Sequence, residues 1–171
     1  MNDSKFKRIF LGLSIIIPFL LYCGYYYSMV FRHAPYKFAE FQSFQFAYGP
    51  GDSLINKYDS KTGDYQYVNA KDSLVKKKIH LNQTELSYLH HKVADLGFWD
   101  FPSNQVMGKD SVDAAGRKPL HYYIAFNYKR TKKEVMYDQQ FNGPQKLIEA
   151  DGMVIKEIQK ILDGAEAREK K

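Results

Sequence analysis

The stretch LNQTELSYLHHKVADLGFWDFP, residues 81–102, carries the clearest helix signal in the chain. Asn82 can cap a helix, and Glu85 follows it three residues later, which is the pattern of a capping box. Gly97 stands where a helix commonly ends. The apolar residues between these signals recur at helical spacing and are Leu86, Leu89, Val93 and Leu96. We therefore predict an amphipathic helix over residues 83–96 that buries one of its sides.

Upstream of this helix, apolar and polar residues alternate, as they do along half-buried strands. Phe44, Phe46 and Tyr48 share one side of a predicted strand, which ends at the turn Gly49-Pro50-Gly51. Further strands are predicted at residues 54–58, 65–69 and 74–81. The first two of these are joined by a turn in which Gly63 is free to take a positive φ. The sequence therefore predicts a strand meander before the helix.

Downstream of the helix, residues 121–128 and 134–140 predict a hairpin. Pro144, a favoured first residue of a helix, opens a final helix that Asp163-Gly164 is expected to end, leaving a polar tail at residues 165–171. The apolar stripe of this helix consists of Leu147, Ile148, Val154, Ile155, Ile158, Ile161 and Leu162. Hairpins pair antiparallel, so we predict an α+β domain in which two helices cover one face of an antiparallel sheet.

An uncharged apolar segment runs from Ile9 to Phe31 near the N-terminus. A helix of about 20 such residues is enough to cross the hydrocarbon core of a membrane. Lys5, Lys7 and Arg8 precede the segment, and the positive-inside rule then places the N-terminus in the cytoplasm. We expect a single-pass signal-anchor in contact with the lipid bilayer, and a folded domain that is extracytoplasmic, either periplasmic or on the cell surface.

Two processed forms are the alternatives to a retained anchor. A cleaved signal peptide has small residues at its cleavage site, whereas Arg32 follows the apolar segment here. A lipoprotein signal places small residues before the lipid-bearing cysteine, whereas the bulky Tyr22 precedes Cys23. The sequence favours the uncleaved anchor, with cleavage or lipidation at Cys23 left open. The expected divisions are residues 1–34 for the N-terminus and anchor, 35–164 for the domain and 165–171 for the tail.

The net charge of +6 divides unevenly along the 171 residues. Four basic residues but one acidic residue flank the apolar segment, so half of the net charge belongs to the anchor. The remaining surface charge is ordinary for a solvated domain, and nucleic acid is not expected as a partner. The one cysteine lies inside the apolar segment, so the folded part can form no internal disulfide.

A resemblance supports the envelope setting. The run FQFAYGPGDSLINKYDSKTGDYQYV (residues 44–68), the helical stretch 81–102, the later hairpin and the closing helix after Pro144 together resemble uncharacterised α+β domains of bacterial envelope proteins and lipoproteins. The resemblance covers residues 40–162 and lies in the pattern of elements. It implies a bacterial envelope location, and it implies no catalytic or binding residues.

His90 and His91 are the most conspicuous candidates for a site. Zinc-binding helices place histidines four residues apart, whereas adjacent residues diverge by about 100° on a helix with 3.6 residues per turn. Both are therefore expected at the surface without a metal. A hydrolase or small-ligand site would instead need a pocket formed near His90, His91, Trp99 and Asp110, which is the alternative to a non-catalytic domain.

Other chemical motifs are weak or absent. Asp100, Asp110 and Asp113 lack the alternating spacing and the glycine of a calcium loop. Lysines at residues 76–78 and the basic turn 129–133 can attract anionic lipid headgroups, but they also suit an edge strand and a solvated hairpin tip. Nucleophile elbows, phosphate loops and dinucleotide fingerprints are missing. We therefore assign no catalytic, cofactor-binding or metal-binding residue.

The segment 103–119 shows no helical or strand period and is long for a connection within a domain. It carries three apolar residues, Val106, Met107 and Val112, which make it a candidate partner-binding loop; a passive mobile loop fits equally well. The expected function is a membrane-anchored, extracytoplasmic protein-interaction or envelope-associated module without catalysis, whose protein partner the sequence does not identify.

Overall fold

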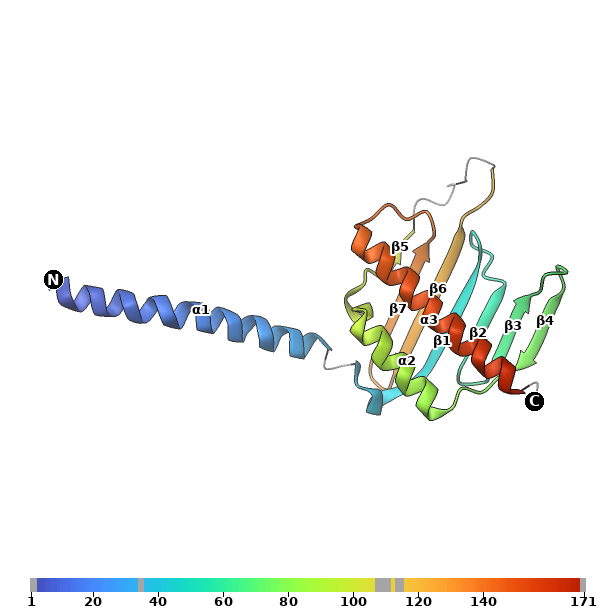
Figure 1. The fold of residues 1–171 in the computed structure, drawn as a ribbon, viewed down its shortest axis with the longest axis horizontal. Coiled ribbons are helices and arrows are strands. Elements are labelled where there is room, and N and C mark those ends of the chain that lie inside the picture. Colours follow the sequence, from blue (N-terminus) through green and yellow to red (C-terminus); the bar gives the residue numbers. More distant parts are fainter. Residues whose placement is uncertain (1–2, 34–35, 107–111, 113–115, 170–171) are drawn as a thin grey trace. The chain divides into compact units, whose positions relative to one another are not determined.

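The computed structural model describes residues 3–33, 36–106, 112 and 116–169, and it divides into two units, residues 1–37 and 38–171. The first unit is a long helix, α1 (Asp3–His33) (Figure 1). Within the described residues, Lys7–Ser28 is the one stretch of helix that is long and apolar enough to cross a membrane, and a signal sequence would have the same properties. The expected N-terminal apolar helix is thus confirmed.

The second unit is built on a seven-stranded sheet with the strand order β4-β3-β2-β1-β6-β7-β5. All neighbouring strands pair antiparallel except β5, which runs parallel to β7. The strands are β1 (Phe41–Pro50), β2 (Asn56–Asp59), β3 (Asp64–Val68), β4 (Leu74–Lys78), β5 (Asn104–Gln105), β6 (Leu120–Tyr128) and β7 (Lys132–Asp138). The predicted meander and the predicted second hairpin are confirmed.

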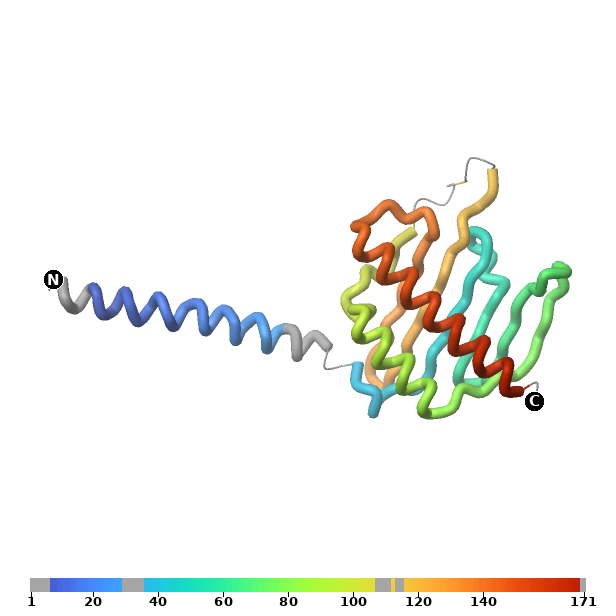
Figure 2. The backbone as a smooth tube through the Cα atoms, viewed as in Figure 1, coloured from blue at the N-terminus to red at the C-terminus, as the bar shows by residue number. Residues whose placement is uncertain are grey.

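Two helices, α2 (Gln83–Asp95) and α3 (Gln145–Glu169), lie on the same face of this sheet (Figures 1 and 2). Short 3-10 turns, η2 (Phe38–Glu40) and η3 (Phe98–Asp100), precede β1 and follow α2. The α+β class and the one-sided arrangement of the helices are therefore confirmed.

The start of α2 is the capping box that the sequence predicts. The Asn82 side chain accepts from the backbone N–H of Glu85, and the Glu85 carboxylate accepts from the backbone N–H of Asn82. Gly97 follows the helix with φ +80°, a conformation that side chains with a Cβ rarely adopt. Both ends of α2 are thus set by local sequence.

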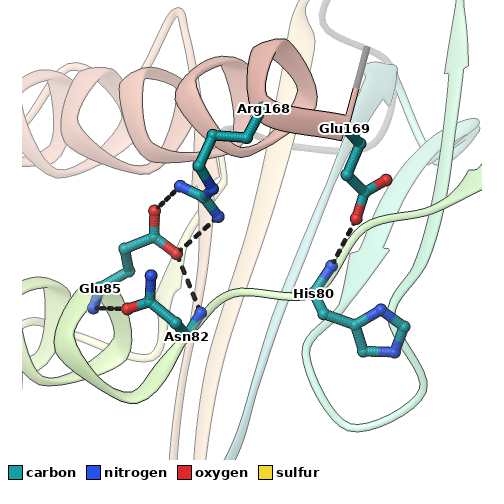
Figure 3. A network of polar contacts seen from close by, with 5 residues as sticks. All are labelled: His80, Asn82, Glu85, Arg168 and Glu169. Carbon is teal, nitrogen blue, oxygen red and sulfur yellow. Dashed lines mark hydrogen bonds and ion pairs between the residues drawn. The ribbon is translucent and has the colours of Figure 1, made fainter. Parts of the chain in front are cut away.

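The same capping glutamate also holds the end of α3. Arg168 donates two hydrogen bonds to the Glu85 carboxylate, and Glu169 accepts from the backbone N–H of His80 (Figure 3). The helix therefore continues to Glu169, and the expectation of a helix stop at Asp163-Gly164 followed by a frayed tail is wrong. Ala165 is fully buried, and these contacts outweigh the weak helix propensity of one glycine.

The core lies between the helices and the covered face of the sheet. Phe44 and Phe46 of β1 are buried there, as are Ile124 and Phe126 of β6. The helices contribute Leu89, Val93, Val154, Ile155, Ile158 and Leu162. Aromatic side chains of this kind bury about 150–250 Å² each, so a few of them account for much of the apolar burial.

One strand was not expected from the sequence. Residues 104 and 105, expected within a loop, form β5 beside Met136 and Tyr137 of β7. Two residues are too few to show any alternation, and a parallel pairing gives no hairpin signal, so sequence pattern could not reveal this strand.

We predict that Leu89→Ala and Ile158→Ala each lower the free energy of unfolding by about 2–5 kcal/mol, the usual range for emptying a buried leucine or isoleucine site. Trp99 is the only tryptophan and is buried, so its fluorescence during urea unfolding of the detergent-solubilised chain is a suitable readout. Lys156→Ala, an exposed position on α3, is the matched control and should change stability by less than about 0.5 kcal/mol. Equal losses in the core and control variants would mean that the packed face is misassigned.

Candidate functional site

Among the described residues of the second unit, no helix covers the face of the sheet opposite α2 and α3. Side chains alternate along a strand, so the neighbours of the buried Phe44, Phe46 and Tyr58 point to this open face. The strand pairing places one open-face side chain from each of six strands in a single row. In order from β4 to β7 the row is Lys76, Gln66, Lys57, Ala47, Tyr123 and Met136.

A shallow hollow of about 300 Å³ lies over the middle of this row. Its place is explained by Ala47, whose small side chain stands between the much longer Lys57 and Tyr123. The residues that line it are Gln45, Phe46, Ala47, Lys57, Tyr58, Asp59, Asp64 and Tyr123. The hollow therefore combines carbon-rich walls with amide, carboxylate and ammonium groups.

The acidic groups around the hollow already have partners. The Gln45 side-chain N–H donates to Asp59 Oδ2 at 2.8 Å. Lys78 Nζ lies 2.8 Å from Asp64 Oδ1, and its hydrogen bond lowers the pKa of that carboxyl. The ammonium groups of Lys57 and Lys76, by contrast, form no ion pair with any residue that the structure describes. Asp59 is hydrogen-bonded to a neutral amide and keeps its negative charge, so the two unpaired ammonium groups leave this region with a net charge of one positive unit.

Tyr123 is held in place at the other side of the hollow. Its hydroxyl donates to Glu134 Oε2 at 3.0 Å and accepts from Lys132 Nζ at 2.9 Å. Lys132 also forms a hydrogen bond with Glu134 itself, which lowers the pKa of that carboxyl. A ring fixed through its hydroxyl group presents a pre-arranged apolar wall, which reduces the entropy lost when a ligand packs against it.

The two histidines of α2 lie in different surroundings. His90 is buried, and its ring packs against other rings, with centroids 5.2–6.2 Å away; these belong to Phe38, Phe41, Trp99 and Tyr128. The His91 ring meets the His90 ring edge to face, with centroids 5.6 Å apart, and its Nδ1 lies 2.7 Å from the carbonyl oxygen of Ser87. The structure thus places His90 in the core, where surface exposure was expected.

The other members of the expected pocket are scattered. Trp99 is buried beside His90, and Asp110 lies outside the described residues. His91 lines a broad surface groove of about 550 Å³ along α2, together with Phe38, Gln83, Thr84, Ser87 and Tyr88. Among the described residues, no group of three or more His, Cys, Asp or Glu side chains is arranged to hold a metal ion.

The candidate partner-binding loop is described in part. Val106 is half-buried and follows β5 directly, and its backbone N–H donates to the Asn104 side chain. Val112 is exposed, with 53% of its surface accessible. Met107 lies outside the described residues. The proposed apolar anchors are therefore not gathered into one surface by the residues that the structure describes.

Sequence reasoning missed a buried carboxylate on the helix side. Asp151 of α3 is 1% exposed, and its Oδ1 accepts from Gln105 Nε2 at 3.3 Å. Its position three and four residues before Val154 and Ile155 places it on the apolar stripe, a signal that was available in the sequence. Burial raises the pKa of Asp151 to about 7.

Two oxygen atoms of Asp151 and Gln105 lack a hydrogen-bond donor within the described part of the chain. Asp151 Oδ2 and Gln105 Oε1 are both buried acceptors without a hydrogen-bond partner among the described residues. A single proton on Asp151 would let its hydroxyl donate to Gln105 and satisfy both atoms. The neutral acid therefore fits this site better than the carboxylate.

A second missed cluster lies at the start of β6. His121 is buried, with Nε2 at 3.6 Å from Asp138 Oδ2 and Nδ1 at 3.9 Å from Asp52 Oδ1. These distances are too long for hydrogen bonds. His121 and Asp138 are buried at the ends of β6 and β7, whereas Asp52, in the turn after β1, is exposed.

No family model matches this sequence, and no curated protein or solved structure matches it either.

We predict that Asp151→Asn removes a pH dependence of stability. The folded state binds the Asp151 proton more tightly than the unfolded state, so wild-type stability should fall as pH rises from about 4 to 7 and stay lower above that. The asparagine amide can donate to Gln105 at any pH, so the variant should be more stable at pH 8 by about 1–3 kcal/mol. Urea unfolding at pH 5 and pH 8 measures the difference.

Asp163→Asn, at an exposed position on the same helix, is the matched control and should leave the pH profile of wild type unchanged. If Asp151→Asn and wild type show parallel stability between pH 5 and pH 8, Asp151 does not retain its proton as we expect.

Proposed function

We propose that this chain is a membrane-anchored binding module whose folded domain lies outside the cytoplasm and presents the open face of its sheet to another envelope component. The N-terminal part supports an anchor, because α1 contains an uncharged stretch of sufficient length with basic residues before it. The anchor would keep the domain close to the membrane, where envelope proteins and glycans are concentrated.

The observation that carries the proposal is the difference between the two faces of the sheet. One face is covered by α2 and α3 over an aromatic core, while the other displays a register-aligned row of mostly polar side chains around a hollow. Binding sites are commonly concave and carry a few oriented polar groups on apolar walls, and the hollow has this composition.

A hydrolase with a pocket near His90 and Trp99 has less support. Both side chains pack within the aromatic core, and a catalytic base must come within hydrogen-bond reach of its substrate. His91, another residue of that expected pocket, does line a surface groove along α2. We therefore favour binding without catalysis.

Site-specific photo-crosslinking in the native cells tests the proposal. A photoreactive phenylalanine analogue would replace Lys57 or Gln66 on the open face, and Lys156 on the exposed side of α3 as the matched control. We expect discrete adducts from both open-face positions and none from the control. Adducts from the control alone, or none from the open face, would remove the support for this surface as the binding site.

A further inference from the structure

The open face carries two positive charges in the row, one on either side of Gln66. Lys57 and Lys76 flank Gln66 on adjacent strands, and both are exposed. Neither ammonium group has an ion-pair partner among the described residues, whereas Lys77 and Lys78 are paired with Glu166 and Asp64. Neighbouring strands lie about 4.8 Å apart, so the two lysine Cα atoms are separated by about 10 Å.

Two long side chains at this separation can converge on a single anionic group placed over Gln66. The Gln66 amide is itself fixed, because its side-chain N–H donates to the carbonyl oxygen of Ile55 at 2.7 Å. Lysine attracts a carboxylate or phosphate as a point charge. The attractions of two lysines therefore add, without the fixed geometry that an arginine guanidinium requires. This half of the row is therefore suited to an anion.

The adjoining hollow is suited to a sugar ring. It lies on the other side of Lys57, with Ala47 as its floor and the fixed Tyr123 ring as one wall. Its volume of about 300 Å³ is at the small end of ligand pockets. The Gln45–Asp59 pair at its rim offers amide and carboxylate oxygens that can accept from hydroxyl groups.

We propose that the open face binds an acidic polysaccharide, with a carboxylate between Lys57 and Lys76 and a neighbouring sugar ring against Tyr123 in the hollow. This proposal rests on the proposed function and names its ligand class. The carboxylate position and the hollow are separated by about two strand spacings, or about 10 Å. The ligand is therefore a chain of sugars rather than a single one.

Two other occupants fit the same surface less well. A second copy of this chain would bring one pair of unbalanced lysines against another, which is unfavourable for directly opposed like charges. An acidic peptide would satisfy the lysines, but it has no need of a hollow with a fixed aromatic wall and hydroxyl-accepting groups. Charge and shape together favour the glycan.

The test measures binding of polygalacturonate oligomers to the full chain in a detergent that has no sugar headgroup. Isothermal titration in dilute salt should detect binding that weakens as salt is added, because the lysine contacts are screened. Methyl-esterified oligomers of equal length carry the same rings without charge and should bind at least tenfold more weakly. Poly-L-glutamate carries the charge without the rings and should also bind at least tenfold more weakly.

Three variants separate the two halves of the site. Lys57→Gln with Lys76→Gln should weaken polygalacturonate binding at least tenfold, and Ala47→Leu should do the same by filling the hollow. The matched control is Lys156→Gln with Lys160→Gln, which removes equal charge from exposed positions of α3 and should change affinity less than twofold. Urea unfolding of each variant verifies that it remains folded.

Specific outcomes would overturn the proposal. Equal binding of poly-L-glutamate, with no effect of Ala47→Leu, would show that the face attracts any polyanion. Absence of polygalacturonate binding together with open-face crosslinks to a protein would reject the glycan and leave the proposed binding module intact. Absence of both would reject the two proposals together.

Discussion

Packing of the α3 stripe against the aromatic side of the sheet is the interaction on which the rest of the structure depends. Helix α3, whose buried stripe is centred on Val154, Ile158 and Leu162, runs diagonally across the strands (Figure 1). Together with α2 it covers one face, and no second set of helices is described for the other. A sheet with one buried and one solvated face is the usual solution for antiparallel strands.

Polar contacts determine where this helix lies along the sheet. At its N-terminal half, Asp151 contacts Gln105 of β5, the strand at one edge. At its C-terminal half, Glu166 contacts Tyr67 and Lys77 of β3 and β4, which lie toward the opposite edge. Arg168 adds the bond to the cap of α2 (Figure 3). The apolar stripe provides stability, and these polar contacts set the position of the helix along the sheet.

Most of the fold follows from local periodicity in the sequence. Alternation in the run containing Phe44 and Phe46 predicts β1, and the Asn82 capping box predicts α2 to within a residue. What the sequence could not give depends on contacts between distant residues. β5 has no period of its own, and the last turn of α3 is stabilised by Glu85, more than 80 residues away.

The candidate site was hidden from sequence for the same reason. Lys57, Ala47 and Tyr123 have nothing in common along the chain, and only the pairing of β2, β1 and β6 places them in one row. The histidine pair was conspicuous because it is adjacent in sequence, yet folding separates its two members into core and surface. Residues that are adjacent on a helix therefore need not share a site, whereas strand pairing decides which distant side chains lie together on a sheet.

The central claim is that an anchored domain displays one face of its sheet outside the cytoplasm, and cysteine labelling in spheroplasts tests it directly. Cys23 is the only natural cysteine, so Cys23→Ser gives a silent background. In that background, a membrane-impermeant maleimide should label Lys57→Cys rapidly in intact spheroplasts, and it should label Ile158→Cys only after denaturation. Labelling of Lys57→Cys only after lysis would place the domain inside, and equal rates at both positions would contradict the one-sided core.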